Sequence, residues 1–333
     1  MNLADVARRA GVSTATVSRV LNNVGVVREE TRVRVARAAE ELRYYPNMHA
    51  RALAGGDSRM IGLIVSNLEN PFFLDIFRSL EAAAHDANYE VLVTNTGYRP
   101  ERLHALIRLM FGRRLSGLAV VVSEMDEPLL DELSHHDLPI VVYDVGAARR
   151  GLVHIKIDYK AGMQRIVSHL VELGHRRLAF LGHHTTLGPL QDRKQTFLDV
   201  VHQFSPTIEY RTATGADSFV GGREAVRAIY GEGFQPTAIV CVNDFMAAGA
   251  LRELRARNLR VPEDVSLTGF DNIELADIVS PSLTTAHIPR DLIGRLIFES
   301  LTSAPQPREI LLTPEFTLRA STAAIVTESC ASS

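Results

Sequence analysis

The sequence has little that would support a metal site or a disulfide framework. Only two of its 333 residues are cysteines, Cys241 and Cys330, and they do not form a pair with zinc-ligand spacing. The histidine pairs His135–His136 and His183–His184 have no nearby Glu-x-x-His motif or cysteine pair that would complete a zinc set. We therefore expect no metal and no cofactor, and a solvated or structural role for these histidines.

Short motifs that mark common enzymes and membrane anchors are also missing. The sequence contains no Gly-x-x-x-x-Gly-Lys, no Gly-x-Gly-x-x-Gly after a strand and no Gly-x-Ser-x-Gly. It has no apolar run long enough to cross a membrane, and its first residues carry Arg8 and Arg9 where an export signal would be apolar. We expect a cytoplasmic protein without enzyme activity, and the few cysteines agree with a reducing compartment.

The first residues contain the start and stop signals of two short helices separated by a tight turn. Asn2 and Asp5 can form a capping box at the start of the first helix, and Gly11 can end it because glycine tolerates positive φ. Ser13 is a suitable N-cap for a second helix that runs to about Leu21. This spacing predicts a helix-turn-helix, whose second helix enters the major groove of DNA.

The second helix has an apolar face and a polar face. Val17, Val20 and Leu21 should pack inward, and five residues should lie outside or at the margins: Thr14, Ala15, Ser18, Arg19 and Asn22. An ordinary capped surface helix would show the same pattern, but charge favours DNA. Residues 1–59 contain ten arginines and six acidic residues, whereas the whole chain has a net charge of −3. A basic head on an acidic body is typical of a module that meets phosphates.

A third helix and a short segment follow. The third helix should run from Arg28 or Glu29 to Leu42 and close a three-helix core, with these apolar positions: Val33, Val35, Ala36, Ala38, Ala39 and Leu42. A break is expected near Tyr45 because Pro46 disfavours the α conformation of the preceding residue. After it, Asn47 can cap a segment from Met48 to Ala54, which is too short to be a stable helix without a partner.

The remaining body alternates between buried-strand and helix patterns. Two sets of strands are predicted, 60–65, 90–95, 117–123 and 139–143, then 177–182, 209–212, 238–242 and 265–269. Such alternation predicts two doubly wound subdomains with parallel sheets, which bind ligands at the carboxyl ends of their strands. The residues that follow the strands suit a polyol: Asn70, Phe72, Phe73, Ser123, Asp144, Asp158, Arg193, Asn243 and Asp271. Asp158 and Asn243 could instead simply cap helices.

Together these motifs resemble the lactose/galactose repressor family of bacterial transcription regulators. The likeness runs from Asn2 to about Ala324 and includes Asp5-Val6-Ala7, Tyr45-Pro46-Asn47, Asn70-Pro71-Phe72-Phe73 and Gly269-Phe270-Asp271. It implies a helix-turn-helix head, a hinge helix and a core of the type I periplasmic-binding-protein kind. It also implies phosphate contacts from Ser13, Thr16 and Asn22, base contacts from Thr14, Ala15 and Arg19, and a minor-groove hinge with Asn47, Ala50 and an inserted Leu53.

The same resemblance assigns the effector site. Arg193 and Asp271 would be its principal ligands, with the other strand-end residues lining the cleft. The sequence departs from the family pattern at Asp217, which stands five residues before Gly222 where an aromatic residue is common. A carboxylate there would favour a hydroxylated or cationic effector.

These observations predict a domain plan and a function. We expect a DNA-binding domain at 1–45, a hinge at 46–58, a core at 59–324 and a flexible tail at 325–333. Within the core, the N-subdomain should comprise about 59–157 plus 288–315, and the C-subdomain about 158–287 plus 316–324. The expected function is a homodimeric repressor whose affinity for double-stranded operator DNA is modulated by a small molecule, such as a sugar derivative.

Two alternatives remain open at this point. A corepressor-dependent or activating regulator would use the same scaffold, so the sign of the effector response is not readable from the residues. A sugar-binding protein would share the body but would need an export signal, which this sequence lacks.

Leu53→Ala tests the hinge. If Leu53 inserts between base pairs, the substitution should weaken operator binding by about 1 kcal/mol or more, because an apolar wedge is what kinks the duplex. Operator affinity is measured by fluorescence anisotropy, with circular dichroism to check the fold. Unchanged affinity would show that Leu53 is only part of a linker.

Overall fold

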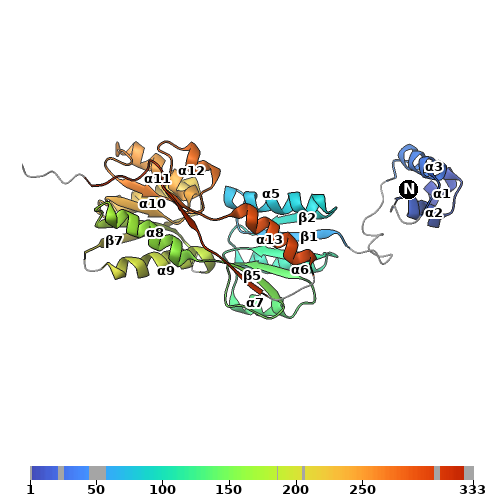
Figure 1. Cartoon of the computed structure of the whole chain (residues 1–333), viewed down its shortest axis with the longest axis horizontal. Coiled ribbons are helices and arrows are strands. Elements are labelled where there is room, and N and C mark those ends of the chain that lie inside the picture. Colours follow the sequence, from blue (N-terminus) through green and yellow to red (C-terminus); the bar gives the residue numbers. More distant parts are fainter. Residues whose placement is uncertain are drawn as a thin grey trace, which may run out of the picture. The chain divides into compact units, whose positions relative to one another are not determined.

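The computed structural model describes residues 2–21, 26–44, 58–185, 187–204, 207–303 and 308–325. The chain divides into two compact units, the head at 1–58 and the core at 59–333 (Figure 1). The predictions for Asn22, Asn47, Ala50 and Leu53 lie outside the described residues. No helix in the described segments is long and apolar enough to span a membrane.

The head consists of three helices, α1 (Leu3–Ala10), α2 (Thr14–Leu21) and α3 (Glu29–Glu41). The predicted capping box between Asn2 and Asp5 is present, and Gly11 ends α1 with a φ of 63°. Ser13 caps α2, because its hydroxyl accepts a hydrogen bond from the Thr16 amide at 3.1 Å. Local side-chain chemistry thus fixes the turn between α1 and α2.

The core of the head differs in part from the prediction for α3. Val35, Ala38 and Ala39 are buried against α1 and α2. Val33 and Ala36 are exposed, so their predicted place in the core is wrong. Val33 lies two residues before Val35, which turns it to the other side of the helix at about 100° per residue.

One lobe of the core, here called the N-lobe, contains a six-stranded parallel sheet. The strand order is β11-β5-β4-β3-β1-β2. The strands are β1 (Met60–Val65), β2 (Glu90–Asn95), β3 (Gly117–Val121), β4 (Ile140–Tyr143), β5 (Leu152–Ile157) and β11 (Arg308–Leu312), and the helices are α5 (Pro71–Asp86), α6 (Pro100–Phe111), α7 (Glu127–Ser134) and α13 (Arg290–Thr302). Leu63 packs with α5 and α13 whereas its neighbour Ile64 packs with α6 and α7, so both faces of the sheet are buried.

The other lobe, the C-lobe, contains a four-stranded parallel sheet in the order β7-β6-β8-β9. Its strands are β6 (Arg177–His183), β7 (Glu209–Gly215), β8 (Ala238–Cys241) and β9 (Ser266–Thr268), with a separate antiparallel pair, β10 (Thr285–His287) and β12 (Glu315–Thr317). Its helices are α8 (Tyr159–Glu172), α9 (Gly188–Gln203), α10 (Phe219–Gly231), α11 (Asp244–Ala256) and α12 (Glu274–Ile278). Both lobes therefore have the predicted doubly wound architecture.

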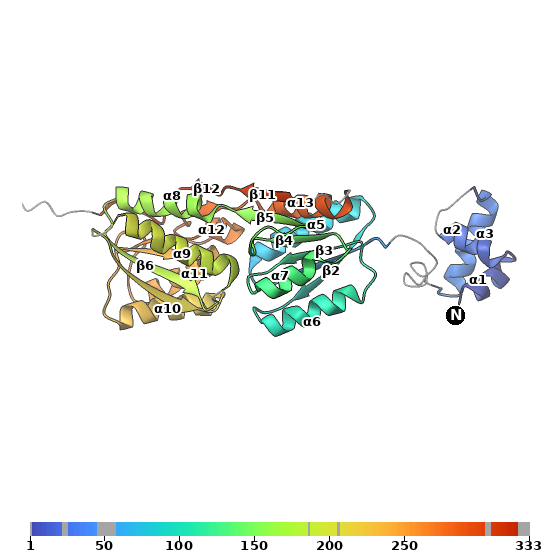
Figure 2. The same cartoon turned by 90° about the horizontal axis from the view of Figure 1, so that it is seen from below.

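The chain passes between the lobes at three described places: between β5 and α8, between β10 and α13, and between β11 and β12. Figure 2 shows β5, β11, β12 and α8 along one edge of the core, with α6 and α10 along the opposite edge. The sequence prediction missed β5 and β11. His154 and Lys156 interrupt the apolar run of β5, and β11 lies at the exposed edge of the sheet.

Helices α10 and α11 pack unusually closely, and glycine permits this. A Cβ atom on Gly222 would lie 2.1 Å from the Met246 carbonyl oxygen, and one on Gly249 would lie 2.1 Å from the Phe219 carbonyl oxygen. Both neighbours are backbone atoms that cannot move without shifting a helix. The two helices consequently form a tightly packed block.

Gly222→Ala should lower the stability of the core by about 2 kcal/mol or more, because the methyl group must push α10 and α11 apart. The matched control is Gly231→Ala in the same helix, where a Cβ atom meets nothing within 4 Å. Calorimetry should show a lower melting temperature for Gly222→Ala and an unchanged or slightly higher one for the control. Equal melting temperatures would contradict the close-packing account.

Candidate DNA-reading helix and effector cleft

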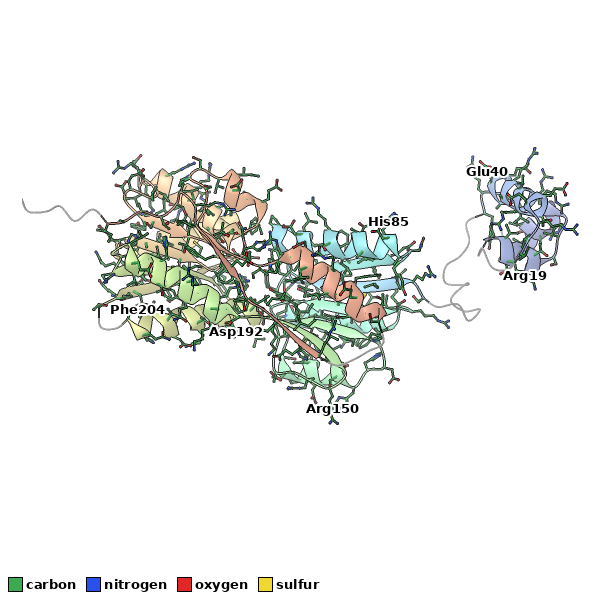
Figure 3. All side chains as sticks on the ribbon, in the orientation of Figure 1. Arg19, Glu40, His85, Arg150, Asp192 and Phe204 are labelled. Carbon is green, nitrogen blue, oxygen red and sulfur yellow. The ribbon has the colours of Figure 1, made fainter. Side chains whose placement is uncertain are left out.

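One face of α2 is free to meet another molecule. Val17 and Val20 are buried in the head, whereas Thr14, Ala15 and Arg19 are exposed. Figure 3 labels Arg19, whose side chain points away from the head on the side opposite Glu40 of α3. Short side chains flanked by an arginine allow close approach to base edges, and arginine suits guanine.

Ion pairs distinguish Arg19 from Arg8, Arg9 and Arg37 of the head. Arg9 and Arg37 both contact Glu41, and Arg8 contacts Asp5. Among the described residues, Arg19 has no carboxylate within 4 Å. Its charge is therefore not neutralised by an ion pair with those residues and is available for DNA.

The cleft between the lobes contains a small pocket. Its walls come from both lobes: Asn70, Phe72, Phe73, Tyr98, Val122, Ser123 and Tyr143 of the N-lobe, and Pro189, Leu190, Arg193, Asn243 and Asp271 of the C-lobe. Aromatic and aliphatic side chains thus surround a few polar groups, the usual composition of a small-molecule site.

A buried ion pair forms one wall of this pocket. The Arg193 Nη2 atom lies 2.9 Å from the Asp271 Oδ1 atom, and each side chain is only 4% exposed. The Arg193 Nη1 atom donates a hydrogen bond to the Val242 carbonyl oxygen at 2.8 Å, and the guanidinium lies 4.8 Å from the centre of the Tyr159 ring. The Phe270 ring is equally close, at 4.7 Å. These contacts hold the arginine in one position.

Burial and charge act against each other in this pair. Burial raises the pKa of Asp271 to about 6, although Arg193 and Arg290 oppose that rise. Burial alone would lower the pKa of Arg193, but the facing Asp271 and Tyr159 raise it above its ordinary value, so the guanidinium stays charged. The pocket therefore has a permanent cation beside an acid that ionises near neutral pH.

Several buried polar atoms near the pocket make no hydrogen bond of good geometry with the described residues, although the Tyr159 hydroxyl lies close enough to interact with Asp144, Tyr143 and Arg193. These atoms are Arg193 Nε, Asp271 Oδ1, Asp144 Oδ2, Tyr143 Oη and Tyr159 Oη. Asp271 Oδ1 is close to the guanidinium but is not aligned for a hydrogen bond. Three of these residues, Tyr143, Arg193 and Asp271, line the pocket, and because unsatisfied buried polar atoms are costly they are suited to a ligand rich in donors and acceptors.

The structure brings most of the predicted effector residues together. Seven of them line the pocket: Asn70, Phe72, Phe73, Ser123, Arg193, Asn243 and Asp271. Asn70 and Asn243 also cap α5 and α11, by accepting hydrogen bonds from the amides of Phe72 and Met246. A helix cap and a pocket wall are thus compatible roles for one asparagine.

Three predicted residues do not line the pocket. Asp158 caps α8 by accepting a hydrogen bond from the Ala161 amide at 2.9 Å. Asp144 lies behind the pocket wall, where its Oδ1 atom accepts a hydrogen bond from the Ile157 amide at 3.4 Å. Both carboxylate oxygens of Asp217 accept hydrogen bonds from protein side chains.

Sequence reasoning missed five lining residues, Tyr98, Val122, Tyr143, Pro189 and Leu190. Tyr98 follows the end of β2 and Tyr143 is the last residue of β4, so both obey the strand-end rule that found the others. Pro189 and Leu190 belong to the first turn of α9, one turn before Arg193. Helical spacing from Arg193 would have indicated Leu190.

Comparisons with known proteins agree with this arrangement. Residues 2–47 match the model of bacterial regulatory proteins of the lacI family, and residues 167–322 match the periplasmic binding protein-like domain. The chain is 34% identical over 317 residues to the HTH-type transcriptional repressor PurR of Vibrio vulnificus (strain CMCP6), with 92% of each chain covered. The chain belongs to the lacI family. It is a DNA-binding transcriptional repressor, and the expectation of a regulator without enzyme activity is confirmed by these repressor relatives.

Solved structures of this family share the fold. A Lac repressor dimer bound to operator and the anti-inducer ONPF has a TM-score of 0.83 and 28% identity, covering 97% of this chain and 99% of the repressor. A complex of the regulator CelR with cellobiose has a TM-score of 0.67 and 27% identity, with 96% and 99% covered. The head and both lobes thus have counterparts in repressors of the lacI family.

Asp144 should make this repressor less stable as pH rises. Burial raises the pKa of Asp144 to about 6, which is above its value in an unfolded chain. Between these two values the folded protein keeps a proton that the unfolded chain has lost, so stability falls as the proton leaves. Asp144→Asn removes this loss, and asparagine tolerates the φ of 50° at this position.

Relative to the unsubstituted protein, Asp144→Asn should gain about 1 kcal/mol between about pH 5 and about pH 7.5, measured by urea denaturation. The control is Asp264→Asn. Arg260 lowers the pKa of Asp264 to about 2, so this carboxylate stays ionised over that range. A pH-independent difference for Asp144→Asn would show that Asp144 is not a buried acid of raised pKa.

Proposed function

We propose that this repressor binds a hydroxylated small molecule, such as a sugar or sugar derivative, in the pocket between its lobes, and that binding changes its affinity for operator DNA. The observation that carries the proposal is the buried Arg193–Asp271 pair in the pocket wall, with the Tyr143 side chain in the same wall. Hydroxyl groups can donate to Asp271 and accept from Arg193, which a purely apolar or purely charged ligand cannot do.

The aromatic side chains fit the same class of ligand. Phe72 and Phe73 are packed edge to face, with ring centres 5.3 Å apart, and Phe72 also contacts Tyr143. Their rings offer an apolar surface for the carbon-bound hydrogens of a sugar ring. The related CelR structure contains cellobiose, which shows that this fold can hold a carbohydrate.

On DNA, Thr14, Ala15 and Arg19 would contact base edges, while Ser13, Thr16, Ser18, Asn22 and the hinge residues Asn47, Ala50 and Leu53 would contact the backbone or the minor groove. One head reads one half-site, so a symmetric operator requires a homodimer. Relief of repression by the effector is our first model, and corepression is the second. Both act by linkage, because the ligand must favour one state of the repressor.

Operator and effector binding can be measured on the same full-length protein. An operator is first selected from a random DNA pool by the unsubstituted chain, and its binding is then titrated with cellobiose, ribose, other sugars, polyols and purines. We expect one compound to change operator affinity by about 5-fold or more, the usual size of such coupling. A decrease indicates an inducer and an increase indicates a corepressor.

Variants separate the two parts of the proposal. Arg193→Ala and the isosteric Asp271→Asn should abolish the response to the compound, whereas Gln195→Ala, an exposed position on the same helix, should retain it. Arg19→Ala should lower operator affinity by about 1–3 kcal/mol and relax sequence preference, whereas Arg34→Ala should preserve that preference. A full response in folded Arg193→Ala would refute the effector site and leave the DNA-binding role intact.

A further inference from the structure

Asp217 lies at the centre of a hydrogen-bond cluster that joins the two lobes. It precedes α10 in the C-lobe and is 4% exposed. From the N-lobe, the Tyr98 hydroxyl donates to Asp217 Oδ2 at 2.5 Å, and the Asn70 side-chain amide donates to the same oxygen at 3.0 Å. The Asn67 amide donates to Asp217 Oδ2 at 3.2 Å and to the Asp217 carbonyl oxygen at 3.0 Å.

Two further residues of the C-lobe contact this cluster. The Asn243 side-chain amide donates to Asp217 Oδ1 at 2.7 Å, so the second carboxylate oxygen is also occupied. The His183 ring of the C-lobe packs against the Tyr98 ring, with centres 4.5 Å apart. Tyr98 is therefore held at both its hydroxyl and its ring face by the opposite lobe.

This position has a mechanical consequence. Tyr98 follows β2 and Asp217 follows β7, which are edge strands of their sheets, and Asn67 and Asn70 follow β1, the strand next to β2. Helices α6 and α10, which come after Tyr98 and Asp217 in the chain, lie on the edge of the core opposite β5, β11 and β12, near which the chain crosses between the lobes (Figure 2). Covalent crossings on one edge and a polar cluster on the other together fix the angle between the lobes.

The same cluster bounds the ligand pocket. Tyr98, Asn70 and Asn243 all line the pocket and all donate to Asp217. Separation of the lobes would remove the three N-lobe donors from the carboxylate and withdraw the Tyr98 ring from the pocket wall. The pocket therefore closes when the Asp217 hydrogen bonds form and opens when they break.

We propose that Asp217 acts as an interlobe clasp: its carboxylate holds Tyr98, Asn70 and Asn67 across the cleft and sets the population of the closed core. Asp217 is a positioning residue in this account, not a ligand of the effector. The clasp does not depend on the identity of the effector or on the proposed regulation, because it is a property of the free protein.

Spin-label distances in the full-length protein, without DNA or effector, test the clasp. Leu109 on α6 and Glu224 on α10 are exposed and lie on different lobes, so Leu109→Cys and Glu224→Cys provide label sites. Cys330→Ser removes one native thiol, and Cys241 is fully buried. Pulsed dipolar spectroscopy then reports the distribution of distances between the lobes.

The labelled parent should show mainly the short, closed distance. Tyr98→Phe, which removes only one hydroxyl, and Asp217→Ala should raise the ratio of open to closed protein, by about tenfold for Asp217→Ala, since hydrogen bonds to a charged group are strong. The double variant should open no further than Asp217→Ala alone. Tyr210→Phe is the matched control, because its hydroxyl bonds to His202 within the C-lobe.

The distance distributions also separate a clasp from a ligand role. A mainly open parent, or closed distributions in both Tyr98→Phe and Asp217→Ala, would overturn the proposal. Loss of effector binding in an Asp217→Ala protein that stays closed would do the same, because it would make Asp217 a ligand. If Asp217→Ala does not fold, the ratio of open to closed protein in Tyr98→Phe alone decides: an unchanged ratio overturns the proposal. These distances are measured without effector, so they do not depend on whether the proposed effector function is correct.

Discussion

The burial of the charged Arg193–Asp271 pair is the constraint on which the cleft depends. A guanidinium removed from water needs a fixed partner, and α9 and the turn after β9 supply the two charges from different parts of the C-lobe. Tyr159, Phe270 and the Val242 carbonyl complete the cage. These contacts hold Arg193 and Asp271 in a fixed arrangement in the pocket wall.

A second arginine, Arg290, is partly buried and connects this cage to the N-lobe. Arg290, beside the crossing between β10 and α13, donates to the carbonyl oxygens of Asp271 and Asn272 and to the Asp75 carboxylate on α5. The residue that would meet the effector is thus linked through one side chain to a helix of the other lobe. The structure therefore contains a direct physical connection from the pocket to the lobe that follows the head in sequence.

Local signals made the head and most strands predictable. The capping box at Asn2, the turn at Gly11 and the apolar runs of β1 and β8 depend on neighbouring residues, which a sequence displays directly. The edge strand β11 depends on pairing with β5, about 155 residues earlier, so its own composition was not informative. In the site, too, local features were predictable and long-range contacts were not. Strand ends indicated Arg193, Asn243 and Asp271. The contact of Asp217 with Tyr98 joins residues 119 positions apart and has no local signature.

The N-lobe sheet is completed by a strand that follows the C-lobe segments in the chain. β11 pairs with β5 at the edge of the N-lobe sheet, although the two strands lie about 155 residues apart in the chain and the C-lobe strands β6 to β9 lie between them. The head precedes both lobes in the chain and can fold before them, since domains fold in order during synthesis. Neither lobe, by contrast, is one continuous stretch of chain. A product truncated before β11 would thus retain the DNA-reading helix α2 but would have an incomplete N-lobe sheet.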